Sequence, residues 1–70
     1  MIIYTKHGLE KMDALGIEDE EVESTVRLGM KWRDADGEKW HAQRGGLEVV
    51  FARQEDMIVI ITVYLARRKK

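Results

Sequence analysis

TKHGLEKMDALG, residues 5–16, is the stretch of sequence that decides the fold. Thr5 is a good helix N-cap, because its side-chain oxygen can accept a hydrogen bond from a free N–H of the first turn. Apolar residues then recur at helical spacing as far as Leu15. Gly16 suits the left-handed residue that commonly ends a helix. The stretch therefore predicts a helix with His7 in its first turn.

A second helix is predicted immediately after this glycine. Four acidic residues at 18–21 complement the positive end of a helix dipole. Val22, Val26 and Met30 then form an apolar stripe, and Gly29 marks the exit. We expect two short helices within residues 5–30, joined as a helical hairpin.

From residue 31 onward the apolar period changes to two, which is typical of strands. Asp36-Gly37, Gly45-Gly46 and Glu55-Asp56 separate the strand segments, and Asp-Gly is a strong hairpin signal. Residues 57–66 are apolar at both odd and even positions, which indicates a central strand or one covered on both sides. We expect the odd positions, such as Val63, to face the helices.

These patterns predict an α+β domain, in which an N-terminal helical hairpin packs on a mainly antiparallel sheet of three to four strands. The strands are expected within residues 31–66, and Ile2-Ile3 is a weaker candidate for a short edge strand. At 70 residues the chain is expected to be a single domain, residues 1–70, ending in a basic tail at 67–70.

Composition argues against several classes of protein. There are no cysteines and only two histidines, so we expect no disulfide, no metal site and no cofactor. Residues 57–66 are too few to cross a bilayer as a helix, and no signal-peptide pattern precedes them. We therefore expect a cytoplasmic protein with no membrane partner.

Charge is unevenly distributed, although the net charge is only −1. Residues 1–23 carry a net charge of −5, and residues 24–70 carry +4. A basic half makes RNA a candidate partner. Two solvated helix faces and a charged tail would give the same pattern.

Four segments resemble family 4258 of the domains of unknown function: residues 7–12 (HGLEKM), 15–17 (LGI), 20–22 (EEV) and 61–64 (ITVY). The family pattern begins His-Ala-x-x-Arg-Met, continues through Arg-Gly-Ile-Ser, and ends in a strand with Val-Thr-Val-Tyr. The resemblance implies a small fold related to RelE- and ParE-like toxins, which belong to a wider group of metal-independent ribonucleases.

The sequence departs from the family pattern at four positions. Gly8 replaces the usual alanine, and Glu18 replaces a capping serine. Lys11 and Leu15 stand where the family has arginines. Because arginine holds phosphate with two parallel hydrogen bonds and lysine does not, a phosphate role for this helix is weakened.

Six residues are the candidates for RNA chemistry. Cleavage without a metal needs a group that takes a proton from the ribose 2′-hydroxyl and another that protonates the leaving oxygen. His7 and Tyr64 are the candidate catalytic residues. The candidates for binding phosphate and RNA are Arg44, Arg53, Arg33 and Lys11.

A different function class fits the same sequence. A purely structural role at a helix start is the alternative for His7. Trp32 and Trp40 can fill the core or a homodimer interface, and with His41 they can also form a stacking platform for bases. The alternative to a ribonuclease is therefore a non-catalytic module that binds an antitoxin-like protein or a second copy of itself.

Overall fold

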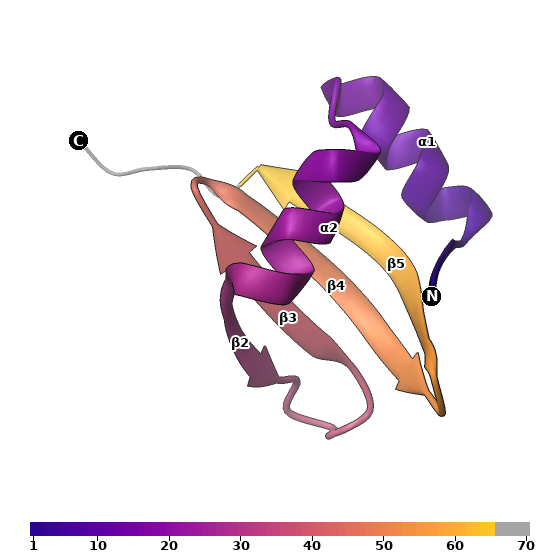
Figure 1. The fold of residues 1–70 in the computed structure, drawn as a ribbon, viewed down its shortest axis with the longest axis vertical. Helices are drawn as coiled ribbons and strands as arrows, with labels where there is room; N and C mark the ends of the chain where they lie inside the picture. The colour runs from indigo at the N-terminus through magenta and orange to yellow at the C-terminus, as the bar shows by residue number, and fades with distance from the viewer. Residues whose placement is uncertain (66–70) are drawn as a thin grey trace.

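A twisted five-stranded sheet organises the structure, a computed structural model that describes residues 1–65 (Figure 1). The predicted tail at 67–70, and Ala66 before it, lie outside the described residues. The elements in chain order are β1 (Ile2–Tyr4), α1 (Lys6–Leu15), α2 (Asp19–Leu28), β2 (Met30–Arg33), β3 (Trp40–Arg44), β4 (Leu47–Gln54) and β5 (Met57–Leu65).

The strands lie in the order β1-β5-β4-β3-β2. Neighbouring strands from β2 to β5 are antiparallel, whereas β1 pairs with β5 in parallel. The predicted α+β class is confirmed, and β5 lies between β1 and β4 rather than at an edge of the sheet. The sheet has five strands rather than three to four, because the two outermost strands have only three and four residues and so carry little sequence pattern.

Helix α2 covers one face of the sheet and encloses the core there. Its buried residues Val22 and Val26 join Ala42, Val49 and Val63 from the three strands beneath. The opposite sheet face, which we call the outer face, is turned away from α2.

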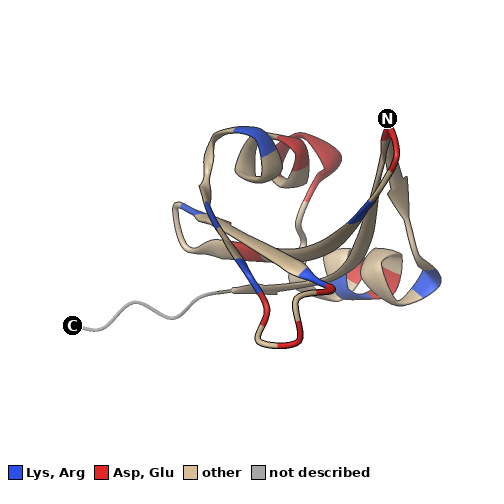
Figure 2. Cartoon of the chain, turned by 90° about the horizontal axis from the view of Figure 1, so that it is seen from below, with Lys and Arg blue, Asp and Glu red and all other residues tan. Residues whose placement is uncertain are grey.

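Helix α1 lies beside β5, beyond the point where the short β1 ends (Figure 1). In the view of Figure 2 the two helices lie on opposite sides of the sheet. They are joined by the short turn that the sequence predicts, and Gly16 ends α1 in the left-handed conformation with φ of 70°. However, they do not cover the sheet together as a hairpin, because α1 occupies the edge of β5 that β1 leaves open.

A β-bulge interrupts the pairing of β4 with β5. Val50 lies opposite Thr62 and Phe51 lies opposite Ile60, so Ile61 is one extra residue. Side chains alternate along a strand, and the extra residue reverses the alternation. Val63 therefore faces α2, as predicted for odd positions, but Ile60 does so too. The alternation predicted for β5 is correct after the bulge and wrong before it.

Thr5 holds this bulge against the start of α1. Its backbone N–H donates to the carbonyl oxygen of Ile60 at 3.1 Å. Its hydroxyl donates to the carbonyls of Ile60 at 2.9 Å and Ile61 at 3.2 Å. The same hydroxyl oxygen accepts the N–H of Gly8 at 3.0 Å, as an N-cap should. One side chain thus fixes both the helix start and the bulge.

Close approach explains the glycine at position 8. A Cβ atom there would lie 2.9 Å from the carbonyl oxygen of Ile60 and 3.2 Å from the Thr5 hydroxyl. Glycine in a helix costs about 1 kcal/mol relative to alanine. At this position the missing side chain lets the first turn of α1 lie directly on β5.

None of the helices within residues 1–65 is long and apolar enough to cross a membrane.

We predict that Thr5→Ala lowers the free energy of unfolding by about 2 kcal/mol, because it removes a cap and leaves the bulge carbonyls without their hydroxyl donor. Thr5→Ser keeps the hydroxyl and should lose less than half as much. Urea denaturation of both variants measures the difference. Equal losses in the two variants would show that the hydroxyl does not hold this junction.

Candidate functional site

Two cross-strand rows of side chains cross the outer face of the sheet. Paired residues in neighbouring strands point to the same side, so the register defines each row. The first row runs through Trp32, His41, Val50 and Thr62. The second runs through Met30, Gln43, Glu48 and Tyr64. Tyr64 and Thr62 therefore share a face, as the sequence predicts.

His41 is the most constrained side chain on the outer face. Its Nδ1 atom lies 2.8 Å from a carboxylate oxygen of Glu48, and its Nε2 atom lies 3.4 Å from Asp34. The Trp32 ring stacks on the imidazole, with centroids 5.2 Å apart and planes 8° apart. The His41 side chain is 18% exposed. A histidine oriented by a carboxylate and still open to solvent can transfer a proton to a bound molecule.

Lys11 and Tyr64 meet on the β5 side of Glu48, the carboxylate that contacts this histidine. The Lys11 ammonium lies 5.6 Å from the centre of the Tyr64 ring, which brings α1 to the end of β5. Tyr64 is 47% exposed and stands directly opposite Glu48 in the sheet. A phenol, a cation and the His41–Glu48 pair are therefore neighbours. We call Lys11, Trp32, His41, Glu48 and Tyr64 the outer-face cluster.

Thr62 adds a buried hydroxyl to the same face. Its residue is only 7% exposed, and its Oγ1 atom has no hydrogen-bond partner among the described residues. A buried polar atom without a partner costs about 1–3 kcal/mol. Thr62 lies in the row of His41, so this unpaired oxygen faces the same side as the cluster.

The two tyrosines lie in different environments. Tyr4 pairs with Ile60 on the α2 side, where burial raises the pKa of its phenol above the ordinary value and the charges of Asp19 and Glu23 raise it further. Tyr4 consequently stays protonated through the neutral range. Tyr64 is the tyrosine that the outer face presents.

His7, the first candidate catalytic residue, is exposed in the first turn of α1. Residues four apart lie on the same side of a helix, so His7 and Lys11 share one side of α1. Among the described residues, no hydrogen bond, ring stacking or cation–π contact joins His7 to His41 or Tyr64.

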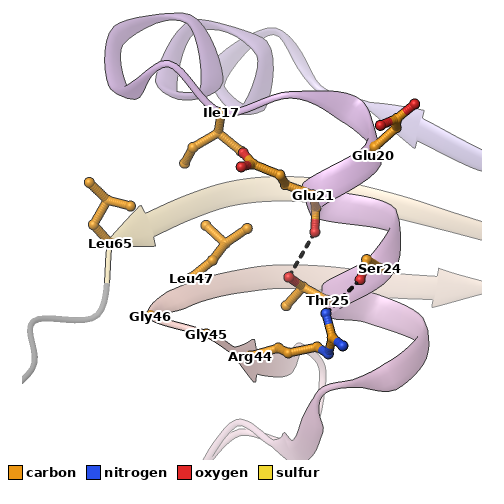
Figure 3. Close-up of a pocket in the computed structure, with 10 residues that line it drawn as sticks. All are labelled: Ile17, Glu20, Glu21, Ser24, Thr25, Arg44, Gly45, Gly46, Leu47 and Leu65. Carbon is orange, nitrogen blue, oxygen red and sulfur yellow. Dashed lines mark hydrogen bonds between the residues drawn. The ribbon is translucent and has the colours of Figure 1, made fainter.

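Arg44 lies on the α2 side, at a cavity of about 520 Å³ near the β3–β4 turn (Figure 3). Its guanidinium donates to the Ser24 hydroxyl of α2 at 2.9 Å. Glu20 and Glu21 line the same cavity. Two carboxylates against one guanidinium make this cavity unfavourable for phosphate.

Arg53 and Arg33 also lie on the α2 side. Arg53 lines a second cavity of about 420 Å³ together with Arg27, Trp40 and other residues. The Arg33 guanidinium lies 5.0 Å from the centre of the Trp40 ring. None of the residues lining either cavity belongs to the outer-face cluster. The six candidate residues thus divide between two faces: Lys11 and Tyr64 meet, and the three arginines do not reach them.

The two tryptophans, Trp32 and Trp40, lie on opposite faces of the sheet, so they do not form one platform. Trp40 stacks on Phe51 at 6.5 Å between ring centroids and is half-buried under α2. Trp32 stacks on His41 instead. Only Trp32 can therefore form a platform with His41, since adjacent residues of a strand point to opposite sides.

Sequence reasoning missed the pairing of His41 with Glu48. Strand alternation places both residues on one face once the Gly45-Gly46 turn fixes the register, so the sequence does carry that signal. The approach of Asp34 has no such signal, because it depends on the path of the β2–β3 loop. Within residues 1–65 no group of three or more histidine, cysteine or acidic side chains is placed to hold a metal ion.

Comparisons with known proteins place the chain in a family. The model of the domain of unknown function DUF4258 matches residues 4–65. A chain from the crystal structure of the toxin–antitoxin complex RelBE2 of Mycobacterium tuberculosis has the same fold, with a TM-score of 0.61 and 16% sequence identity. That similarity covers 90% of this chain and 93% of the other. No curated protein matches the sequence significantly.

The family match covers nearly the whole described chain, and the structural match is almost as extensive. The chain is therefore a member of the DUF4258 family, with a RelE-like fold.

Proposed function

We propose that this protein is a toxin-type ribonuclease that binds RNA across the outer face of its sheet and cleaves it without a metal ion. One observation carries the proposal: His41, Glu48, Tyr64 and Lys11 are neighbours on a single face. Together they offer a proton-transfer group, a carboxylate that orients it, a phenol and a cation. The RelE-like fold supports the same class of activity.

The proposed reaction uses the RNA itself as nucleophile. The ribose 2′-oxygen attacks the adjacent phosphorus and loses its proton, while the bond from phosphorus to the 5′-oxygen breaks and that oxygen gains a proton. The products are a 2′,3′-cyclic phosphate and a free 5′-hydroxyl. No oxidant, reductant or second substrate is needed.

His41 is the proposed base. Glu48 holds Nδ1 at 2.8 Å, whereas Nε2 makes only a 3.4 Å contact with Asp34. Because this contact is the longer one, a bound substrate can replace Asp34 at Nε2 more easily than it can replace Glu48 at Nδ1. Glu48 is a positioning residue, because its contact with Nδ1 fixes the orientation of the ring.

Tyr64 and Lys11 are proposed to act at the phosphate. The phenol can protonate the leaving 5′-oxygen, and the ammonium beside it can offset the negative charge that develops on phosphorus oxygens. The exposed part of Trp32 can stack on a base of the bound strand. His7 remains a second candidate for proton transfer, since it lies on the same side of α1 as Lys11.

The negative net charge of residues 1–65 limits how tightly this part of the chain can bind RNA. All 13 acidic residues precede residue 57 and four of the 12 basic residues follow residue 66, so residues 1–65 carry a net charge of −5. RNA affinity depends largely on neutralising phosphates. We therefore propose that the basic residues 67–70 supply much of the affinity.

A non-catalytic role as an interaction module is the second candidate. The exposed edge strand β2 favours it, because Met30 is 71% exposed and Trp32 is 38% exposed. An antitoxin-like partner fits this alternative, since the structural neighbour comes from a toxin–antitoxin complex.

We predict that the purified protein cleaves single-stranded RNA in the presence of EDTA, and that His41→Asn lowers the rate about 10²–10⁴-fold. Tyr64→Phe and Lys11→Gln should each lower it about tenfold or more, because each removes one group at the phosphate. Gel assays with end-labelled RNA measure these rates. Detection of a 2′,3′-cyclic phosphate identifies the chemistry.

Arg44→Gln is the matched control for that experiment, because it removes one cation from the other side of the sheet. It should change the rate less than about threefold. If cleavage is absent, or is unaffected by both His41→Asn and His7→Ala, the ribonuclease proposal is wrong.

Replacing the four basic tail residues by glutamine should weaken RNA binding and flatten its dependence on salt. The slope of log K against log salt is negative, and its magnitude decreases by about 0.7 for each phosphate that the protein no longer neutralises. Lys6→Gln, one cation removed from α1, is the control and should leave the slope nearly unchanged. Fluorescence anisotropy at several salt concentrations measures both. An unchanged slope in the tail variant would mean that the tail does not bind phosphate.

Thr62→Val should raise the free energy of unfolding by about 1 kcal/mol, because it replaces an unpaired buried hydroxyl with a methyl group of similar shape. If the hydroxyl serves the cluster, the same variant should also cleave RNA more slowly. Urea denaturation gives the first quantity. A destabilised Thr62→Val protein would mean that the hydroxyl has a partner after all.

A further inference from the structure

Strand β2, which has four residues, leaves one edge of the sheet unpaired within residues 1–65. It is the last strand in the order, and all four of its residues are exposed. Leu28, just before it, is 63% exposed. An unpaired strand edge with exposed apolar residues is a template for another strand.

The backbone groups that this edge offers follow from the hairpin. The N–H of Asp34 donates to the carbonyl of Lys39 at 2.7 Å, and in an antiparallel ladder bonded pairs alternate with unbonded ones. Trp32 and Met30 therefore bond inward to β3. The N–H and C=O groups of Lys31 and Arg33 point outward.

The two sides of the edge have different chemistry. Lys31 and Arg33 lie on the α2 side, since they pair with Ala42 and Trp40 of that face. Met30 and Trp32 lie on the outer face. A strand added here would meet two cations on one side and two large apolar side chains on the other.

A second copy of this chain fits the edge poorly. A two-fold axis perpendicular to the sheet must pair residues that share a face. If Lys31 or Arg33 lies on the axis, that residue meets its own copy, and if Trp32 does, Lys31 meets Arg33. An axis through Met30 pairs no other residue of β2 with β2 of the second copy. Like charges directly opposite each other in a sheet are destabilising. Charge complementarity therefore favours a different partner.

We propose that the free edge of β2 binds an extended protein segment that alternates acidic and apolar residues, as a sixth strand of the sheet. Backbone bonds to Lys31 and Arg33 would supply part of the affinity, and side-chain alternation would supply specificity. The acidic residues would face Lys31 and Arg33, and the apolar residues would face Met30 and Trp32. The proposal is independent of any RNA cleavage.

Amide hydrogen exchange followed by NMR tests the proposal on the full chain. The probe is a capped hexapeptide, Glu-Val-Glu-Val-Glu-Val. At saturating concentration it should slow exchange of the Lys31 and Arg33 amides by about tenfold or more, because those amides gain hydrogen-bond partners. Two control peptides, Lys-Val-Lys-Val-Lys-Val and Glu-Glu-Glu-Val-Val-Val, should leave both amides nearly unchanged.

A matched pair of variants tests the charge argument. Arg33→Glu should raise the Kd of the Glu-Val peptide about tenfold, because it places like charges opposite one another. Lys6→Glu makes the same change of charge on α1 and should leave the Kd unchanged. The proposal is overturned if the Glu-Val peptide protects neither amide or if the Lys-Val peptide protects them equally. It is also overturned if the amides become protected with rising protein concentration and no peptide, since that would mean self-pairing.

Discussion

The hydroxyl of Thr5 makes the hydrogen bonds on which the rest of the structure depends. It caps α1 and at the same time donates to the two carbonyls of the bulge in β5. Because the bulge reverses the alternation of side chains, Ile60 and Val63 can both enter the core under α2. The same reversal sends Thr62 and Tyr64 to the outer face. Gly8 contributes to this junction of α1 with the bulge, because its missing side chain lets α1 lie directly on β5.

The junction between the start of α1 and the bulge in β5 explains why the two faces of the sheet carry different side chains. On the α2 side, the cations have local contacts that leave their charge uncompensated: Arg44 with the Ser24 hydroxyl, and Arg33 with the ring of Trp40. On the outer face, α1 brings Lys11 to Tyr64, and the sheet register brings Glu48 to His41. A short helix placed at the strand edge, rather than over the sheet, therefore helps to form the cluster. The edge at β2 shares Trp32 with the outer-face cluster, and its unpaired backbone groups suit a protein strand.

Most of the fold follows from local signals in the sequence. Thr5, Gly16 and the Asp-Gly and Gly-Gly turns mark where elements begin and end, and the apolar periods identify their type. The bulge could not be predicted, since residues 57–61 are all apolar and no alternation before Thr62 marks the change. The one extra residue, Ile61, is why the face predicted for the residues of β5 is wrong before the bulge and correct after it. For the site, the sequence predicts correctly that Tyr64 and Thr62 share a face. It does not show which face the arginines occupy, because that depends on how the strands pair. The approach of Asp34 to His41 depends on a loop whose path no periodicity encodes.

The bulge and the edge position of α1 together form the central claim, and a NOESY spectrum of the intact protein tests it most directly. The account predicts cross-peaks from the Tyr64 ring to the side chains of Lys11 and Glu48, and from the Trp32 ring to His41. It also predicts contacts from both Ile60 and Val63 to the α2 side of the core. Cross-peaks from Tyr64 to Val26 of α2, with none to Lys11, would contradict it. They would mean that β5 has no bulge and that the outer-face cluster does not form.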